Sequence, residues 1–387
     1  MTNISYLKFK EIILFFFIIL EASNYINFFT TTINFLIIYT LIILLGLNFI
    51  KNYQIIYSFS KPFKLIYILS LLYFSFHFVL GYFLSENYWD LKWIFYVYLP
   101  WVTCFALILL SNVIVEKSYD LLKFFYLIVL CSLIIFLFFN NDQIFQRFLS
   151  WIYIPILFFK YLKPRDRLII ISISLMLVIL FYNDWRVNII RIIFSYLVIF
   201  VIYTKIISSK RFIFLLCNTL ILLPFLYLFF KTYSNLDLFD FFLTSDSNLP
   251  LENTRSFLIE EILAEMKNNN VSFIFGGSPS QSFYSPLFVT DDNFITGNFN
   301  RQAAETGFMT LLLKTGIIGI FLLYMITYYS VKNLLNNNNQ ISLILALAIS
   351  FNWLLFFIAL PIKMNLSNAL FFLLIGLSFS KFIKNLK

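Results

Sequence analysis

The stretch AETGFMTLLLKTGIIGIFLLYMITYYSV, residues 304–331, decides the fold, because its apolar residues fall on every side of a helix and do not alternate. Residues 30–50, TTTINFLIIYTLIILLGLNFI, have the same character. A membrane-spanning helix needs about 20 mostly apolar residues, and both stretches are long enough. A transmembrane β-barrel would instead show alternation over segments of about 10 residues. The two stretches therefore predict α-helices that cross a membrane.

The composition of the whole chain supports the same conclusion. Of the 387 residues, 61% are hydrophobic and 12% are charged, and the mean hydropathy is +0.87. Soluble domains have roughly 45–50% apolar and about 25% charged residues, so a water-soluble fold would have too little polar surface for this chain. In a bilayer, only helices or a closed barrel satisfy every backbone polar group. We therefore expect an all-α fold, a polytopic membrane helical bundle.

Apolar blocks between polar breaks predict about 12 transmembrane helices, or 11 if the first two blocks form one unit. We expect one membrane domain over 1–387, with helices 1–9 in 1–231, a large outer loop in 232–303, and helices 10–12 in 304–387. The expected spans lie near residues 11–29, 30–50, 64–84, 92–111, 121–139, 145–162, 167–183, 187–204, 211–231, 304–331, 341–360 and 364–383.

Basic residues indicate the orientation of the chain. With both termini in the cytoplasm, most of the 28 basic residues lie on the cytoplasmic side, as the positive-inside rule requires. The loop 232–303 then faces the periplasm or the cell exterior. The net charge of +9 is spread over cytoplasmic loops beside anionic lipid and forms no basic domain. We therefore expect membrane lipid as a partner and no nucleic acid.

The large loop has the pattern of an ordered segment. In NTRSFLIEEILAEMK, residues 253–267, Leu258, Ile262 and Met266 share one helical face and the glutamates lie off it. Asn253 is a candidate N-cap. The pattern predicts an amphipathic helix on the membrane surface or over a cavity, followed by a tight turn in FGGSPSQ, residues 275–281.

Arginine is concentrated on the outer side, where positive charge is otherwise scarce. The planar guanidinium binds phosphate oxygens bidentately, so an outer arginine cluster near helix ends indicates a diphosphate site. The alternative for each arginine is an ion pair with a nearby acidic residue such as Asp184 or Glu305. The outer arginines are Arg147, Arg186, Arg191, Arg255 and Arg301.

Arg186 and Arg191 open the eighth expected helix in NDWRVNIIRIIF. Five residues separate them, so they point about 140° apart and cannot both face one narrow groove. Arg186, at the mouth of the helix, is the better candidate for a lipid headgroup. Arg191, about a turn and a half deeper, needs a buried partner or a water-filled cavity.

The tenth expected helix opens with RQAAETGFMTLLLKTGIIGIFLLY, residues 301–324, which combine an acid, a cation in an apolar run and glycines. Glu305 is expected in its first turn, where the helix dipole favours a carboxylate. Gly307, Gly316 and Gly319 permit close approach of another segment. Lys314, about two turns below Glu305, indicates a hydrated interior.

The remaining reactive residue types point to no cofactor and no metal. Cys104, Cys131 and Cys217 lie in apolar segments without metal-ligand spacing, and His77 lies mid-span as a packed, hydrogen-bonded core residue. Asp291 and Asp292 are an alternative metal site or base, but no third oxygen ligand stands beside them.

Three features together resemble the bacterial O-antigen polymerases and the related O-antigen ligases. They are the string at 304–324, an arginine followed about twenty residues later by FGG, and DWR before an apolar helix. The resemblance covers roughly residues 180–330. Ligases carry a histidine where this chain has Glu305, which favours a polymerase. The matching residues are Arg186, Arg255, Gly276 and Gly277 of the turn, Glu305, and the glycine pair Gly316 and Gly319.

The resemblance implies a metal-independent glycosyltransferase in the bacterial cytoplasmic (inner) membrane. It would join oligosaccharide repeat units carried on polyprenyl (undecaprenyl) diphosphate, in O-antigen (lipopolysaccharide), capsule or exopolysaccharide synthesis. Arg186 and Arg255, with Arg191 and Arg301, would bind the donor diphosphate, and Glu305 would position or deprotonate the acceptor hydroxyl. A flippase and a chain-length regulator are the implied protein partners.

Other functions remain open at this point. A lipid-linked oligosaccharide flippase or other transporter also has about 12 helices, but it needs no outer loop of about 70 residues, and the two halves of this chain show no repeat. A ligase, a glycosyltransferase of another membrane class and a structural component of a capsule exporter are further alternatives.

Overall fold

The structure is a computed structural model of the chain. It describes residues 12–13, 16–17, 19–20, 31–114, 152–180, 186–204, 210–234, 256–269, 271–285, 300–304, 306–337, 339–358, 361–380 and 383.

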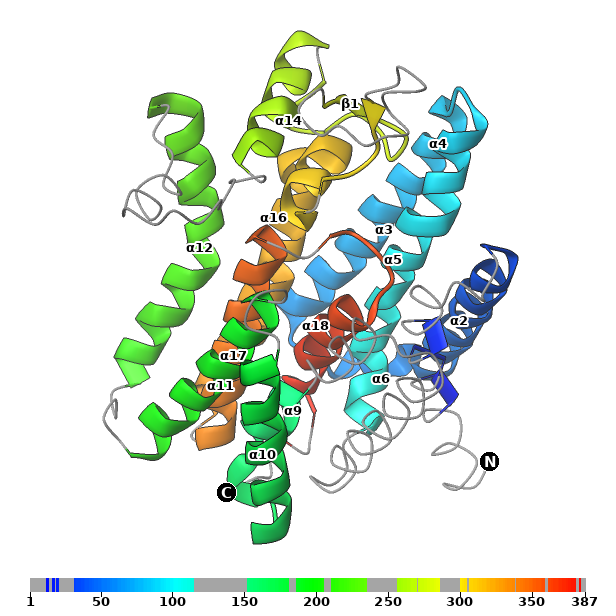
Figure 1. The fold of residues 1–387 in the computed structure, drawn as a ribbon. Coiled ribbons are helices and arrows are strands. Elements are labelled where there is room, and N and C mark those ends of the chain that lie inside the picture. Colours follow the sequence, from blue (N-terminus) through cyan, green and yellow to red (C-terminus); the bar gives the residue numbers. More distant parts are fainter. Residues whose placement is uncertain are drawn as a thin grey trace.

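Six helical segments of the described chain are long and apolar enough to cross a membrane, so the chain is an all-α membrane protein (Figure 1). They coincide with six of the expected spans. The other expected spans either lie partly or wholly outside the described residues or are represented by shorter helices. The six segments are Ile33–Ser58, Lys61–Leu84, Tyr88–Leu110, Lys210–Phe230, Gly307–Asn336 and Gln340–Ile358.

The helices and strands have the following bounds. The helices are α2 (Thr31–Asn52), α3 (Lys61–Leu84), α4 (Tyr88–Trp93), α5 (Leu99–Thr103), α6 (Leu107–Ile114), α9 (Tyr153–Leu157), α10 (Pro164–Leu180), α11 (Arg186–Tyr203), α12 (Lys210–Ser234), α14 (Ser256–Asn268), α16 (Gly307–Asn336), α17 (Gln340–Ile358) and α18 (Leu366–Leu377). The strands β1 (Phe283–Tyr284) and β2 (Asn300–Arg301) pair antiparallel, with Phe283 opposite Arg301.

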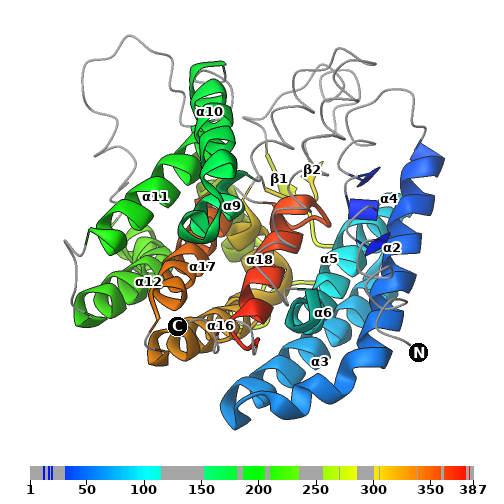
Figure 2. The same cartoon turned by 90° about the horizontal axis from the view of Figure 1, so that it is seen from below.

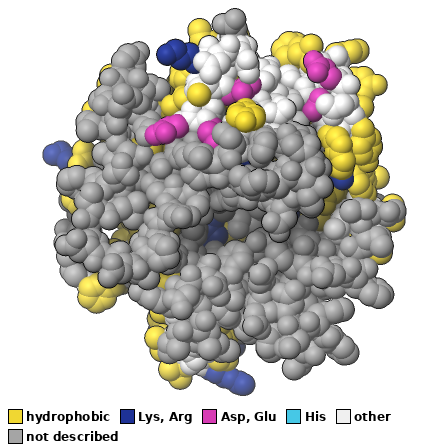
Figure 3. Space-filling model, turned by 45° about the horizontal axis from the view of Figure 1, so that its top comes forward, with side chains coloured by type: hydrophobic (Ala, Val, Ile, Leu, Met, Phe, Trp, Pro, Cys, Tyr) yellow, Lys and Arg dark blue, Asp and Glu magenta, His cyan; other side chains and the backbone are white. Residues whose placement is uncertain are grey.

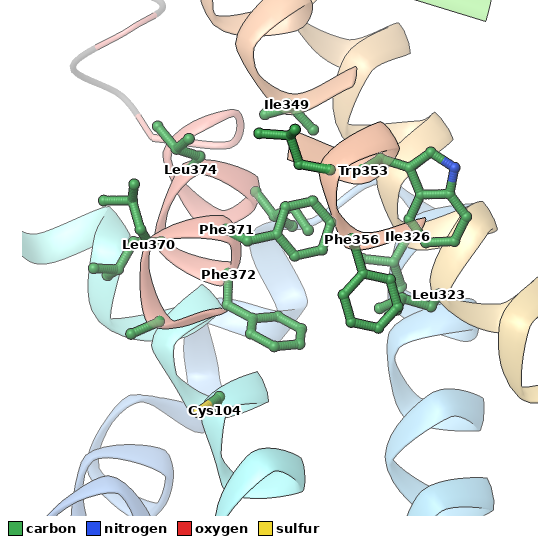
Figure 4. Close-up of a cluster of buried hydrophobic side chains, with 14 of the residues drawn as sticks. Cys104, Leu323, Ile326, Ile349, Trp353, Phe356, Leu370, Phe371, Phe372 and Leu374 are labelled. Carbon is green, nitrogen blue, oxygen red and sulfur yellow. The ribbon is translucent and has the colours of Figure 1, made fainter. Parts of the chain in front are cut away.

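The helices surround a central pair formed by α16 and α17. Figure 2 shows α16, α17 and α18 between α9 to α12 on one side and α2 to α6 on the other. In the centre of the bundle, buried apolar side chains of α16, α17 and α18 pack together (Figure 4). Cys104, next to the end of α5, borders this cluster. Trp353 of α17 is fully buried and its indole N–H donates to the Ile221 carbonyl of α12 at 3.0 Å. Close packing of this kind holds membrane helices together where water supplies no driving force between them.

One end of the bundle carries the amphipathic helix α14 and the paired strands β1 and β2. The helices α4 and α14, the strand β1 and the start of α16 lie together at the top of Figure 1, and we call this the loop end. In α14, Leu258, Ile262 and Met266 are buried, whereas Glu260 is exposed. The helix therefore packs its apolar face downward, over the start of α16 and against β1.

The described cysteines and the histidine are core residues. Cys104 and Cys217 are buried and free, while Cys131 lies outside the described residues. His77 is 2% exposed and its ring lies 4.6 Å from that of Tyr73. The Nδ1 atom of His77 has no hydrogen-bond partner within the described part of the chain, so packing rather than hydrogen bonding at that atom holds the ring.

Candidate functional site

Helix α16 is broken at Gly316, nine residues after it begins. Gly316 has φ 65° and ψ −170°, far from helical values and in the region that favours glycine. Such a break removes backbone hydrogen bonds on both sides of the glycine. Because unsatisfied backbone groups are costly inside a membrane, another segment has to supply the partners.

The loop that follows α14 supplies them. The Gly277 N–H donates to the Leu313 carbonyl at 2.9 Å, and the N–H groups of Ile317 and Ile318 donate to the carbonyls of Phe273 and Ile274 at 2.9 and 3.2 Å. Loop and helix thus exchange bonds in both directions, much as two strands of a sheet do. The loop closes on itself through the Gly276 N–H, which donates to the Ser272 carbonyl at 2.7 Å.

Two glycines make this contact possible. Gly276 has φ 74°, and a Cβ atom there would overlap the backbone nitrogen of Gly316. A Cβ atom on Gly316 would in turn overlap the Ile274 carbonyl oxygen. The two backbones therefore meet with no room for a side chain on either side.

One face of α3 covers the same junction. The Tyr73 hydroxyl donates to the Thr315 carbonyl at 2.7 Å, which satisfies another acceptor freed by the break. Gly81, two turns further along, packs against Pro279 of the loop, and a Cβ atom there would lie 2.9 Å from the proline Cδ. His77 stands between them in the helix, so Tyr73, His77 and Gly81 form one stripe along α3.

A buried cation lies directly above the break. Lys314 is fully buried, and its Nζ donates to the Gln281 carbonyl of the loop and to Gln302 Oε1, the latter at 3.1 Å. Its ammonium also lies 4.2 Å from the centre of the Trp93 ring, a favourable cation–π distance. Instead of pointing into a hydrated interior, as the sequence suggested, Lys314 is held by protein groups from α4, the loop and the β2 segment.

Gln302 carries the interaction on to a carboxylate. Its Nε2 donates to Asp90 Oδ1 at 2.8 Å, so the amide lies between the opposite charges of Lys314 and Asp90. Asp90 Oδ2 accepts from Asn87 Nδ2 at 3.0 Å and from the Glu86 N–H at 3.2 Å. We call Lys314, Gln302 and Asp90 the relay. It joins α16, the β2 segment and α4 at the loop end.

Acidic side chains of α14 border the relay. Glu265 Oε1 accepts from Gln281 Nε2 at 3.3 Å, and Glu261 Oε2 accepts from the Ser285 hydroxyl at 2.6 Å. The other oxygen of Glu261 is buried with no hydrogen-bond partner among the described residues. Figure 3, in which the loop end is turned toward the reader, shows several acidic side chains at this end of the molecule. The carboxylates of α14 can accept hydrogen bonds from the hydroxyls of a polar ligand, whereas the relay groups are bonded to one another and to the loop.

The structure brings together some of the residues singled out from the sequence. Gly276 and Gly277 meet Gly316 at the break, and Arg301 lies in β2, opposite Phe283 of the same loop. Arg255, Glu305, Asp291 and Asp292 lie outside the described residues. Arg186 begins α11, but its side chain is also outside them.

The chain next to residue 305 is well fixed. Ala304 and Thr306 are each 3% exposed, and the Thr310 hydroxyl accepts from the Ala304 N–H at 2.9 Å and donates to the Thr306 carbonyl at 3.0 Å. Thr306, with φ −103° and ψ 126°, is the N-cap of α16. Helix α16 therefore begins at Gly307, directly after its N-cap, and the prediction for Glu305 concerns a residue outside the described part of the chain.

Arg191 belongs to a different group of helices. It is 3% exposed in α11, and its guanidinium donates to the Ser367 hydroxyl of α18 at 3.5 Å. Its Cζ lies 5.8 Å from the ring centre of Tyr153, whose hydroxyl donates to Asn352 Oδ1 of α17 at 3.5 Å. The burial expected for Arg191 is present, with polar partners from α9, α17 and α18 nearby.

Sequence reasoning missed most of the relay. A lysine in an apolar helix was a visible signal, but its partners Gln281, Gln302 and Asp90 lie in distant segments and form no motif. Tyr73 was equally hidden among the aromatic residues. Among the described residues, no three His, Cys, Asp or Glu side chains come together as metal ligands would.

Comparisons with known proteins add no relative. The chain matches no family model, no curated protein and no solved structure.

Proposed function

We propose that the chain is a polysaccharide polymerase, a membrane glycosyltransferase that joins oligosaccharide repeat units carried on polyprenyl diphosphate. The observation that supports this most is the contact of Gly276 and Gly277 with the break at Gly316. These glycines lie about 40 residues apart in the sequence, and each belongs to a motif that resembles the O-antigen polymerases. Their contact gives the resemblance a physical basis, since motifs that serve one site should lie together.

The proposed reaction is a glycosyl transfer without a metal ion. The acceptor hydroxyl oxygen attacks the anomeric carbon of the donor glycan, the new glycosidic bond forms, and the carbon–oxygen bond to the diphosphate breaks. Polyprenyl diphosphate leaves, and Arg186 and Arg255, with Arg301, stabilise its charge, whereas Arg191 is held by α9 and α18 and takes no part in this step. Glu305 receives the hydroxyl proton or orients the hydroxyl.

The relay has a supporting part in this proposal. Lys314 of α16 binds the Gln281 carbonyl of the loop and the Gln302 side chain. It thereby fixes both the loop and the segment around residue 302 to the first part of α16. A rigid shell of this kind keeps reacting groups within the small tolerance that catalysis requires. The described network would therefore position Glu305 without contacting the sugar itself.

The proposal includes an orientation. Both termini lie in the cytoplasm, about 12 helices cross the inner membrane of a bacterium, and the loop 232–303 lies outside. Substrate would reach the site from the outer leaflet after a flippase, and a chain-length regulator would act on the product. O-antigen, capsule and exopolysaccharide are all products of this type.

The test is glycan chain length in cells that lack the gene. The cells are complemented with the wild type, Arg255→Ala, Glu305→Ala or the matched control Glu260→Ala, which changes an exposed glutamate on α14. Membrane expression is checked for each. We expect a ladder with the wild type and the control, and single repeat units with the two site variants. Loss of all surface glycan, with repeat units held on the cytoplasmic leaflet, would instead indicate a flippase.

A further inference from the structure

The tip of the docked loop consists of three consecutive apolar residues with exposed side chains. Phe273, Ile274 and Phe275 are 44%, 54% and 58% exposed. Their backbone, in contrast, is tied to α16, because the Phe273 and Ile274 carbonyls accept from Ile317 and Ile318. The segment therefore turns its polar backbone toward the protein and its apolar side chains away from it.

The tip lies well below the end of the helix. The span Gly307–Asn336, which contains α16 with its break at Gly316, is long and apolar enough to cross the bilayer. Gly316 lies roughly 13 Å from the loop end of this helix. The headgroup layer accounts for only about 5–8 Å on each side, so a tip about 13 Å below a helix end at the membrane surface would lie at the depth of the acyl chains.

The backbone of the tip meets the condition for entering a membrane. Non-helical backbone is tolerated at such a depth only where protein groups satisfy it. In this turn the Phe273 and Ile274 carbonyls accept from α16, the Gly277 and Gly276 N–H groups donate to the Leu313 and Ser272 carbonyls, and the Phe275 N–H donates to the Ser272 hydroxyl at 3.1 Å. The turn therefore presents little unsatisfied polarity together with its apolar surface.

The two helices that contact the loop also carry exposed apolar side chains. On α3, next to the stripe that meets the loop, Phe76 and Phe83 are 61% and 76% exposed. On α16, about one turn beyond the junction, Phe321 is 50% exposed. Both helices are long and apolar enough to span the membrane, so these side chains face acyl chains.

We propose that Phe273, Ile274 and Phe275 form a re-entrant tip that inserts into the lipid leaflet at the loop end and contacts its acyl chains. The side chains of the tip would thus anchor the loop in the bilayer, while its backbone supplies the hydrogen-bond partners that the break in α16 leaves free. This inference goes beyond the proposed function and holds or fails independently of it.

Spin labelling tests the depth of the tip directly. Cys104, Cys131 and Cys217 are replaced by serine, a single cysteine is placed at Ile274, and the protein is reconstituted in phosphatidylcholine–phosphatidylglycerol vesicles. Matched control sites are Leu72, a 63% exposed residue of α3, and Glu260 on α14. The nitroxide's collision rates with oxygen and with a water-soluble nickel chelate are then measured.

At Ile274→Cys we expect the oxygen-to-nickel ratio to match Leu72→Cys and to exceed Glu260→Cys several-fold. A ratio like that of Glu260→Cys would overturn the proposal, because the tip would then lie in water. Low collision rates with both reagents would also overturn it, since protein would cover the tip. Phe273→Cys and Phe275→Cys repeat the measurement independently if the first variant does not fold.

Discussion

At the scale of single residues, Gly316 and Gly276 bring two backbone segments into direct contact. Both have positive φ, and each would drive a Cβ atom into the backbone of the other segment. We expect Gly316→Ala to lower the free energy of unfolding by about 3 kcal/mol, the upper range for strain at such positions, because the backbone must also shift. Thermal unfolding in detergent measures the change.

The matched control is Gly46 of α2, where an added Cβ would meet nothing within 4 Å. Gly46→Ala should leave the melting temperature unchanged or raise it slightly, since alanine is the better helix former. Equal melting temperatures for the two variants would contradict the tight contact at Gly316.

Lys314 tests whether the relay is a coupled charge system. Removing one partner of a buried ionic network leaves the other charge uncompensated, so we expect Lys314→Met to cost about 3 kcal/mol of stability. Asp90→Asn alone should also destabilise. The double variant should lose about 1–2 kcal/mol less than the two single losses combined, because the charges act on each other through Gln302.

Denaturant unfolding of the four proteins completes this cycle. Lys332→Met is the control, since Lys332 is an exposed lysine on the same helix. Strictly additive losses would show that Lys314 and Asp90 are independent, and the relay would then be two separate hydrogen bonds.

At the scale of elements, the loop 272–277 and the break in α16 should behave as one unit. The loop and the helix satisfy each other's free backbone N–H and C=O groups. If either segment opened alone, these polar groups would lose their partners. In hydrogen–deuterium exchange we expect peptides covering 272–277 and 313–318 to be protected together. In Gly316→Ala both should exchange faster, while α18 in the core stays unchanged.

Exchange that speeds up in only one of the two segments would show that the loop and helix are not cooperative. Tyr73→Phe provides a milder version of the test. It removes one donor to the Thr315 carbonyl and should raise exchange in both segments by a smaller amount.

The sequence predicts some features of these elements and hides others. The apolar run 304–331 correctly predicted a helix long and apolar enough to cross a membrane. This property depends only on consecutive residues, so the sequence shows it directly. The break at Gly316 could not be predicted, since glycine is common in membrane helices and only the docked loop reveals its conformation. The partners of Lys314 were hidden for the same reason, as Gln281, Gln302 and Asp90 meet it only after the chain has folded.

At the scale of the whole molecule, burial separates a centre from a periphery. In the most apolar 18 residues of α17, 83% are buried. The corresponding share is 28% in the segment Ile33–Ser58 and 33% in α3. A helix that is apolar on all sides and buried belongs inside the bundle, whereas the outer helices turn apolar side chains to lipid. The loop end therefore lies over the closely packed centre of the bundle.

Orientation is the whole-molecule property that the proposed function requires. Lys163 and Lys210 lie at one end of the spans and Glu86 and Asn269 at the other, and all four are exposed. The positive-inside rule predicts that the two lysines face the cytoplasm. In spheroplasts of a variant without native cysteines, we expect cysteine at Glu86 or Asn269 to react with a membrane-impermeant maleimide. Cysteine at Lys163 or Lys210 should react only after permeabilisation. The reverse pattern would place the loop end in the cytoplasm, where polymerisation on the outer leaflet is impossible.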